Sequence, residues 1–253
     1  MSATTAMAAR ALALLDLTDL SDTCGQTHID LLCRRAITPH GKVAAICIWP
    51  QFVQYASGKL KGSGVRIATV INFPRGGSDI DRALDDTQEA LRDGADEIDL
   101  VMPWHAFLQG DETGPRDMMA AVADATAGAH VLKVILETGA LVQPETIARA
   151  SRLAIAAGAN FIKTSTGKIA VSATPEAART MMEAIKASGK SVGFKAAGGV
   201  RNVADAGIYL DLADTIMGPH WASPASFRFG ASGLLDNLLA TLDGKQAAGT
   251  EMY

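Results

Sequence analysis

The sequence predicts a closed (β/α)8 barrel of parallel strands, and three observations lead to that prediction. Eight short, apolar, β-rich segments recur along the chain, and their first residues lie 29, 23, 30, 34, 30, 31 and 35 residues apart. Each interval has room for one strand, one helix and two short loops. The central segments show little polar alternation, as expected for parallel strands covered on both faces. A chain of 253 residues also has the length of one such barrel.

One barrel domain is expected to span residues 1–253, because no low-complexity linker or change of composition divides the chain. A short helix is expected before the first strand, and a C-terminal tail over about residues 243–253. The eight predicted strands, in chain order, are Leu14–Leu17, Val43–Trp49, Arg66–Ile71, Asp96–Met102, His130–Leu136, Asn160–Thr164, Ser191–Lys195 and Ser226–Gly230. The segment Thr215–Met217 competes with the last of these for the eighth strand. An open, doubly wound parallel sheet is the alternative fold.

The loops between these segments carry residues that typically begin and end helices. Gly94 and Gly158 open two similar segments that lie 64 residues apart, or about two strand–helix units. Each glycine is expected just beyond the end of a helix, where it adopts a left-handed backbone conformation easily. Thr174-Pro175-Glu176 is typical of a helix start, with a capping hydroxyl, a proline at the first helical position and an early acid.

Composition and charge exclude several classes of function. The chain is 48% hydrophobic and has a net charge of −4, from 23 Lys and Arg against 27 Asp and Glu. Its longest basic run is Arg34-Arg35, so no nucleic-acid partner is expected. No segment approaches the roughly 18 consecutive apolar residues of a membrane span, so no membrane partner is expected either. The three cysteines form neither a CxxC pair nor an even disulfide set, which indicates a reducing, cytoplasmic location.

The motifs of common cofactors are missing from the sequence. It contains no GxxxxGK[ST] loop and no GxGxxG motif after a strand, so nucleotide cofactors have no support. None of the five histidines has the spacing of a zinc site, and no metal is expected. We therefore expect chemistry that uses side chains alone.

Three lysines stand among apolar residues on three consecutive predicted strands, namely Lys133, Lys163 and Lys195. A single such lysine more often reaches water from a strand end or pairs with a core carboxylate. Three in succession, with Asp99 on the preceding strand, favour an active site instead. Burial and a neighbouring ammonium both lower the pKa of a lysine, and the neutral amine is a nucleophile that forms a Schiff base with a carbonyl.

A phosphate subsite is predicted at the loops after the seventh and eighth strands, where barrel enzymes commonly bind phosphate. Ala197-Gly198-Gly199-Val200-Arg201-Asn202 follows the seventh strand and Phe229-Gly230-Ala231-Ser232-Gly233 the eighth, and each opens a helix. Small residues let backbone N–H groups approach an anion, and helix N-termini add positive potential. One Gly-Gly pair is more often an ordinary turn, but two such loops at these strands favour phosphate. Thr164-Ser165-Thr166-Gly167-Lys168, after the sixth strand, offers further donors.

Two further side chains lie toward the ends of the first and second strands. Asp16 is equally consistent with a helix cap and with an acid of the active site. Cys47 is more often a small buried apolar residue than a reactive one.

Nine short blocks spread over nearly the whole chain occur together in one known family. They are Leu15-Asp16-Leu17-Thr18, Ala45-Ile46-Cys47-Ile48, Asn72-Phe73-Pro74, Gly94-Ala95-Asp96-Glu97-Ile98-Asp99, Leu132-Lys133-Val134-Ile135, Phe161-Ile162-Lys163-Thr164-Ser165-Thr166-Gly167-Lys168, Gly193-Phe194-Lys195, Ala197-Gly198-Gly199-Val200-Arg201 and Arg228-Phe229-Gly230-Ala231-Ser232. In this order they closely resemble the deoxyribose-phosphate aldolases, which are class I aldolases.

The resemblance implies a cofactor-free, homodimeric barrel enzyme that reversibly cleaves 2-deoxy-D-ribose 5-phosphate to acetaldehyde and D-glyceraldehyde 3-phosphate. Lys163 matches the family's Schiff-base lysine, and Lys195 matches the second lysine, whose charge lowers the pKa of the first. Asp99 matches the acid that relays protons with Lys195, and Asp16 matches another carboxylate of the site. Lys168 matches a contact to a sugar hydroxyl. The positions that match the phosphate loops are Gly167, Gly198, Gly199, Gly230 and Ser232. Further candidates for the site are Lys133, Cys47, Thr18 and Tyr253, the last of which matches a C-terminal tyrosine that folds toward the site.

Three positions depart from the family pattern. Ala196 stands where relatives often have proline, Gly233 where they often have a second serine, and Trp49 where they often have an aromatic hydroxyl. These departures concern phosphate affinity and substrate breadth rather than the reaction class. Two other functions remain as alternatives: a phosphosugar aldolase or transaldolase with a ketone donor, and a non-catalytic barrel that binds sugar phosphates. The second leaves the three strand lysines unexplained.

Overall fold

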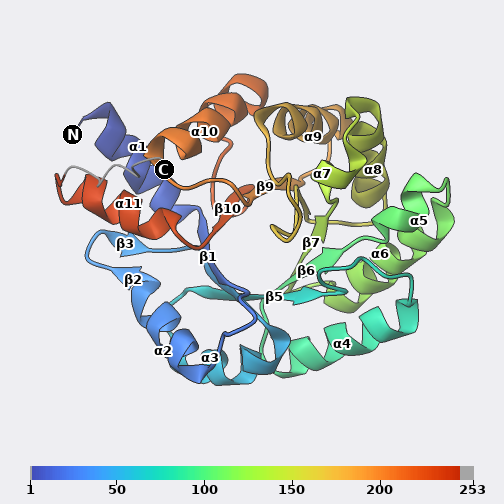
Figure 1. Cartoon of the computed structure of the whole chain (residues 1–253), viewed down its shortest axis with the longest axis horizontal. Helices are drawn as coiled ribbons and strands as arrows, with labels where there is room; N and C mark the ends of the chain where they lie inside the picture. The colour runs from blue at the N-terminus through green and yellow to red at the C-terminus, as the bar shows by residue number, and fades with distance from the viewer. Residues whose placement is uncertain (1, 246–253) are drawn as a thin grey trace.

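The computed structural model describes residues 2–245, and eight parallel strands at its centre close into a barrel (Figure 1). The strands are β1 (Leu15–Asp19), β4 (Ala45–Ile48), β5 (Arg66–Ile71), β6 (Glu97–Val101), β7 (Val131–Ile135), β8 (Phe161–Lys163), β9 (Gly193–Ala197) and β10 (Phe227–Ala231). Each strand pairs with its neighbours in the chain, and β1 pairs with β10 to close the ring. The predicted (β/α)8 barrel is therefore confirmed, and the open doubly wound sheet is excluded.

Helices surround the barrel on its outside (Figure 1). They are α1 (Ala3–Ala13), α2 (Gln26–Arg35), η1 (Pro50–Phe52), α3 (Val53–Leu60), α4 (Ile80–Arg92), α5 (Trp104–Leu108), α6 (Thr113–Thr126), α7 (Thr138–Leu141), α8 (Pro144–Ala156), α9 (Pro175–Ser188), α10 (Val203–Met217) and α11 (Leu234–Leu242). The expected helix before the first strand is α1, which packs against α10 and α11. Among residues 2–245, none of the helices combines the length and the apolar character that crossing a membrane requires.

Strand ends differ from the predicted ones by up to two residues. The segment Thr215–Met217 is the last turn of α10, so the eighth strand is β10, one residue later than predicted at each end. The strand β9 continues to Ala197, two residues beyond the predicted end, because Ala197 pairs with Gly230 on β10. A small antiparallel hairpin of β2 (Ile37–Thr38) and β3 (Gly41–Lys42) was not predicted. Runs of apolar residues mark where a strand is buried, whereas hydrogen-bonding partners decide where it ends.

The expected helix ends are present. The hydroxyl of Thr174 accepts a hydrogen bond from the Ala177 N–H at the start of α9, and Pro175 is the first helical residue. Gly94 and Gly158 follow α4 and α8 with φ values of +104° and +100°. A Cβ on Gly94 would also lie 2.7 Å from the Ser57 hydroxyl, so this turn requires glycine in two respects.

The main apolar core lies between the barrel and the helices. Along a strand, alternate side chains face opposite ways, so Ile98 and Leu100 of β6 pack in this core while Glu97 and Asp99 face the barrel interior. A smaller apolar cluster of Leu20, Cys47, Ala68 and Val70 lies apart from the main core, with Trp49 and Phe73 packed against it. The barrel interior is thus charged in its middle.

Two adjacent leucines of α2 provide a test of this arrangement. Leu32 is 8% exposed and belongs to the core, whereas Leu31 is 49% exposed. Leu32→Ala should lower the free energy of unfolding by about 2–4 kcal/mol through lost burial and a residual cavity. Leu31→Ala should change it by less than about 0.5 kcal/mol, because an exposed side chain loses little burial, and the slightly higher helix propensity of alanine is common to both variants. Urea denaturation measures both, and equal losses would contradict the described packing of α2.

Candidate active site

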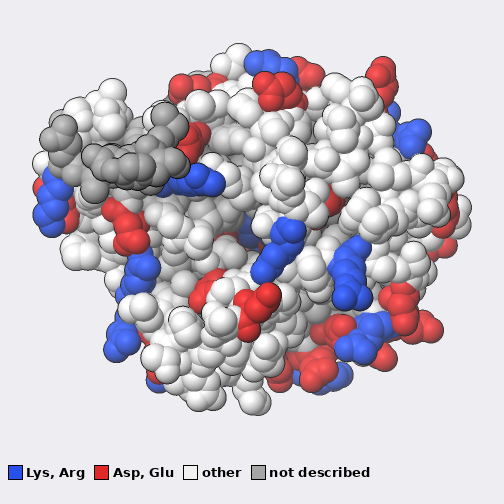
Figure 2. Space-filling view, viewed as in Figure 1, with Lys and Arg blue, Asp and Glu red and all other residues white. Residues whose placement is uncertain are grey.

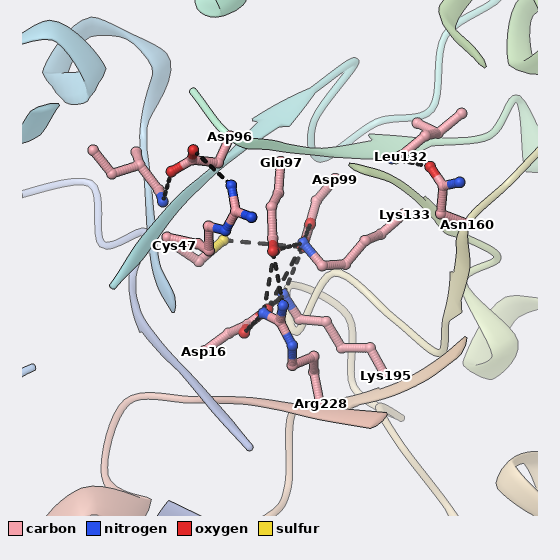
Figure 3. A network of polar contacts seen from close by, with 12 residues as sticks. Asp16, Cys47, Asp96, Glu97, Asp99, Leu132, Lys133, Asn160, Lys195 and Arg228 are labelled. Carbon is pink, nitrogen blue, oxygen red and sulfur yellow. Dashed lines mark hydrogen bonds and ion pairs between the residues drawn. The ribbon is translucent and has the colours of Figure 1, made fainter. Parts of the chain in front are cut away.

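Seven charged side chains from six strands meet inside the barrel, and we call them the charged network. Its members are Asp16, Glu97, Asp99, Lys133, Lys163, Lys195 and Arg228. Each is 5% exposed or less. Several contacts join strands that are not neighbours, such as Lys195 on β9 with Asp99 on β6. Such contacts require that the side chains point into the barrel, and Figure 3 shows several of them converging there.

Asp99 is in contact with all three of the strand lysines. Its Oδ2 atom accepts hydrogen bonds from Lys163 Nζ at 2.7 Å and from Lys195 Nζ at 2.7 Å. Its Oδ1 atom accepts one from Lys133 Nζ at 2.9 Å. Strand register makes this possible, because Asp99 lies opposite Lys133, and Lys163 lies opposite Lys195. The sequence placed these four residues on consecutive strands, and the structure shows which oxygen each ammonium contacts.

Lys195 is held between two carboxylates. Its Nζ atom lies 2.5 Å from Asp16 Oδ2 and 2.7 Å from Asp99 Oδ2. The other oxygen of Asp16 accepts a hydrogen bond from Arg228 Nη1 at 2.6 Å. Asp16 therefore lies within β1 and bridges two cations, and it caps no helix.

Glu97 and Arg228 belong to the network although sequence reasoning did not select them. Arg228 Nη2 lies 2.7 Å from Glu97 Oε1, and Lys133 Nζ lies 2.5 Å from Glu97 Oε2 (Figure 3). Two signals in the sequence point to them. Glu97 precedes Asp99 by two residues and so shares its face of the strand. Arg228 stands between two phenylalanines in a predicted strand, which is the same pattern that selected the lysines.

The electrostatic environment stabilises the charged forms of most of the network. Burial raises the pKa of Asp99, but Lys133, Lys163 and Lys195 outweigh burial and hold this pKa well below its usual value. Asp16 behaves in the same way, with its pKa lowered net by Lys195 and Arg228 against burial. Burial lowers the pKa of Lys195, but the adjacent carboxylates more than compensate, and the net pKa is raised. The pKa of Lys133 is also raised, by Asp99 and Glu97 against burial.

Lys163 is the exception among the three lysines. Burial lowers its pKa, Asp99 opposes this, and Lys195 lowers it further, so the net pKa lies below the usual lysine value. Charge balance gives a simple reason. Four basic groups face three carboxylates in the network, so losing the proton of Lys163 leaves three cations against three anions. In a low-dielectric interior a balanced set of charges is favoured over an excess of one sign.

A cavity of about 350 Å³ opens above the network. Lys163 is the only member of the charged network that lines it. The other candidate residues on its wall are Thr18, Gly167, Lys168, Gly198, Gly199, Gly230 and Ser232. A larger hollow of about 800 Å³ lies outside the barrel beside α4, and it contains none of these residues. The smaller cavity is therefore the candidate active site, and Figure 2 shows a hollow with charged side chains near the centre of the molecule.

The wall opposite Lys163 presents the starts of two helices. Asn202 caps the N-terminus of α10, and Gly233 precedes α11. Arg201 and Gly233 both line the cavity. The N–H groups of Arg201, Val203 and Asp205 already donate to side-chain oxygens. The positive ends of the two helix dipoles still favour an anion at such a place. This wall has the chemistry of a phosphate site.

Lys168 lies across the mouth of the cavity. Its Nζ atom donates a hydrogen bond to the Leu20 carbonyl oxygen at 2.8 Å and lies 3.6 Å from Asp22 Oδ1. The same ammonium stands 5.9 Å from the centre of the Trp49 ring. Lys168 therefore connects the loop after β8 with the loop after β1.

The remaining candidate residues are Cys47, Thr18 and Tyr253. Cys47 is buried, its Sγ atom lies 4.0 Å from Asp99 Oδ2, and burial raises the pKa of its thiol. The hydroxyl of Thr18 donates to the Asp16 carbonyl oxygen at 2.8 Å and lines the cavity. Tyr253 and most of the predicted C-terminal tail lie outside the described residues.

Comparison with known proteins agrees with this geometry. The chain is 54% identical over 242 residues to a deoxyribose-phosphate aldolase of Agrobacterium fabrum, which covers 95% of this chain and 93% of the relative. The tetrameric structure of deoxyribose phosphate aldolase from Aeropyrum pernix superposes with a TM-score of 0.76 at 25% identity, over 95% of this chain and 93% of that one. A crystal structure from Toxoplasma gondii shares the fold, with a TM-score of 0.86 at 23% identity and 97% of each chain covered. The model of the DeoC/LacD family aldolases matches residues 7–233, so the chain is an aldolase that belongs to this family.

Proposed function

We propose that this aldolase reversibly cleaves 2-deoxy-D-ribose 5-phosphate to acetaldehyde and D-glyceraldehyde 3-phosphate through a Schiff base on Lys163. One observation supports this most directly. The lysine of the charged network whose pKa is lowered is also the member that lines the cavity. The name of the Agrobacterium fabrum relative supports the choice of substrate.

The reaction begins with attack of the neutral Lys163 amine on C1 of the open-chain sugar phosphate. Loss of water gives a protonated imine, which withdraws electrons from the neighbouring carbons. The C3 hydroxyl then loses its proton and the C2–C3 bond breaks, so that glyceraldehyde 3-phosphate departs with C3 as its aldehyde and a two-carbon enamine remains on Lys163. Protonation of the enamine carbon and hydrolysis of the resulting imine release acetaldehyde and restore the amine.

Asp99 and Lys195 are placed to move the protons that these steps require. Asp99 Oδ2 is 2.7 Å from both Lys163 Nζ and Lys195 Nζ, so it joins the nucleophile to a second ammonium. Lys195 remains protonated between Asp16 and Asp99, and it supplies a proton to a group at Lys163 either through Asp99 or through a water molecule. General acid–base assistance of this kind typically contributes about 10²–10⁴-fold.

The other end of the substrate is assigned to the glycine loops. Gly198 and Gly199 have φ values of +80° and +86°, so this turn presents backbone without side chains at the cavity wall. A phosphate group here is within the field of the α10 and α11 N-termini. Lys168, at the mouth, is proposed to contact a hydroxyl of the sugar.

The homodimer implied by the family resemblance stays a prediction for this chain. The Aeropyrum pernix relative is described as a tetramer, so assembly differs from the predicted dimer in at least one protein of this fold. Light scattering after size-exclusion chromatography distinguishes the two assemblies.

Borohydride trapping with acetaldehyde tests the nucleophile. In the unmodified enzyme, reduction should leave an ethyl group on Lys163, located by peptide mass mapping. Lys163→Leu should lose the adduct and reduce turnover of the sugar phosphate by at least about 10⁴-fold, because the other lysine at the cavity, Lys168, donates a hydrogen bond from its ammonium to the Leu20 carbonyl oxygen and does not contact Asp99. Lys190→Leu removes a lysine from the exposed surface and should keep both the adduct on Lys163 and the turnover of the sugar phosphate. An adduct on Lys133 or Lys195 would reassign the nucleophile, and none at all in the folded protein would overturn the mechanism.

Lys195→Leu should move the acidic limb of the plot of kcat/KM against pH to higher pH. Lys163 is faced by Asp99 on β6, by Lys195 on β9 and by Cys47 on β4. Lys195 disfavours a proton on Lys163, and it also neutralises part of the charge on Asp99. Without Lys195 the pKa of Lys163 rises, so a smaller fraction is neutral at pH 7 and the rate recovers as the pH increases.

The measurement is kcat/KM for cleavage between pH 5 and 10, whose acidic limb reports the free enzyme. Lys190→Leu serves as the control, because it removes the same charge from the surface and should leave the limb in place. A Lys195→Leu profile that is lower at every pH but unshifted would show that Lys195 does not set the pKa of Lys163.

A further inference from the structure

Glu137 is a buried carboxylate that the mechanism above does not use. It follows β7 by two residues, at the end of the barrel where the cavity opens, and it is 0% exposed. Among the described residues it forms no ion pair with a lysine, arginine or histidine. Burial raises the pKa of this carboxyl, and its hydrogen bonds with Thr166 oppose that change. Its bonds therefore indicate what it does.

Both oxygens of Glu137 are bonded to one residue of the cavity wall. The backbone N–H of Thr166 donates to Oε1 at 3.2 Å, and the Thr166 hydroxyl donates to Oε2 at 2.6 Å. The same hydroxyl accepts a hydrogen bond from the Lys168 N–H at 3.0 Å. Glu137 thus holds the segment Thr166–Lys168, all three residues of which line the cavity, although Glu137 itself does not.

The backbone around Glu137 is fixed from both sides. Glu137 has φ +59° and ψ +58°, a left-handed conformation that residues other than glycine adopt at an energetic cost. The Leu136 N–H donates to the Lys163 carbonyl, and the Thr138 N–H donates to the Thr164 carbonyl, both at 2.9 Å. These bonds tie the turn to β8 and to the start of the Thr166–Lys168 segment. The strained turn places the carboxylate beneath this segment.

These bonds also decide which donors of the segment stay available. The N–H of Thr166 is taken by Glu137, and the N–H of Lys168 is taken by the Thr166 hydroxyl. Within residues 2–245, the N–H of Gly167 has no protein acceptor. The segment therefore presents one free backbone donor and the Lys168 ammonium at the cavity wall.

We infer that Glu137 is a positioning residue that fixes the Thr166–Lys168 segment for the hydroxyl- and phosphate-bearing part of the substrate. This inference rests on the proposed function for the identity of the substrate. In this inference, the residues that bind the hydroxyl- and phosphate-bearing part of the substrate are distinct from those that activate Lys163. Loss of Glu137 should consequently weaken binding of the sugar phosphate while leaving Schiff-base formation with acetaldehyde intact.

The test compares two reactions of the same variants. Glu137→Ala should raise KM for 2-deoxyribose 5-phosphate by about tenfold, the effect of losing a buried charge-assisted hydrogen bond. Its rate of borohydride-trapped adduct formation on Lys163 with acetaldehyde should stay within about twofold of the unmodified enzyme. Glu137→Gln should raise this KM less than Glu137→Ala does, because the amide oxygen of glutamine still accepts a hydrogen bond from the Thr166 N–H. Glu145→Gln removes an exposed carboxylate from the start of α8 and should change neither value.

A double-mutant cycle with Thr166→Val tests whether Glu137 acts through Thr166. If it does, the double variant Glu137→Ala/Thr166→Val should raise KM by no more than about twofold beyond the worse single variant. If the double variant raised KM by the product of the two single effects, the inference would be overturned. An unchanged KM in Glu137→Ala would also overturn it. If the rate of trapping and kcat/KM fell equally, Glu137 would act on the reactivity of Lys163 instead of on substrate binding.

Inorganic phosphate provides a readout that does not depend on the reaction. Calorimetry should show weaker phosphate binding in Glu137→Ala than in Glu145→Gln, in samples whose far-UV circular dichroism and melting temperature show that they are folded. Failure of the unmodified enzyme to trap acetaldehyde would refute the proposed function alone. Equal phosphate affinity in Glu137→Ala and Glu145→Gln would refute the role of Glu137 alone.

Discussion

Four basic side chains lie inside the barrel because three carboxylates lie there with them. Lys195 and Arg228 share Asp16, Lys133 and Arg228 share Glu97, and all three lysines share Asp99. Each ion would be expensive to bury alone, and removing one partner would leave the others uncompensated. The excess of one basic group over the carboxylates makes one amine the natural site of proton loss. The arrangement of contacts selects Lys163, which keeps only a single carboxylate contact, to Asp99.

The register of the parallel strands decides which lysine of the charged network reaches the cavity. The interior residues of neighbouring strands lie side by side in register, so Asp99 stands beside Lys133, and Lys163 stands beside Lys195. Lys163 is the last residue of β8, whereas Lys133 and Lys195 have further strand residues beyond them. Of the three lysines, Lys163 alone reaches the cavity for this reason. The strand that ends earliest exposes its lysine to the cavity, and the charged network lies behind that lysine.

The two ends of the cavity have different physical character. At Lys163 the environment is buried and ionic, and burial together with Lys195 lowers the pKa of the amine. At the opposite wall, glycine loops and the positive ends of the α10 and α11 dipoles favour an anion. The segment Thr166–Lys168 joins the two ends, since it follows Lys163 directly and is held in place by Glu137. The proposed binding and covalent steps thus depend on separate sets of contacts that meet at the end of β8.

The sequence alone determined the alternation of strands and helices, the barrel that it implies and the family, because composition, periodicity and short motifs are local properties. It also located lysines on consecutive strands, since a charged residue within an apolar run is visible without a structure. The tertiary structure decided which charges pair. Arg228 and Asp16 are 212 positions apart, and Glu137 and Thr166 are 29 apart, so no local pattern joins them. The sequence indicated only that Glu97 shares a strand face with Asp99, and nothing in it singled out Glu137. Closure of the barrel brings Arg228 of β10 to Glu97 of β6, whereas the pairing of β7 with β8 brings Glu137 to Thr166.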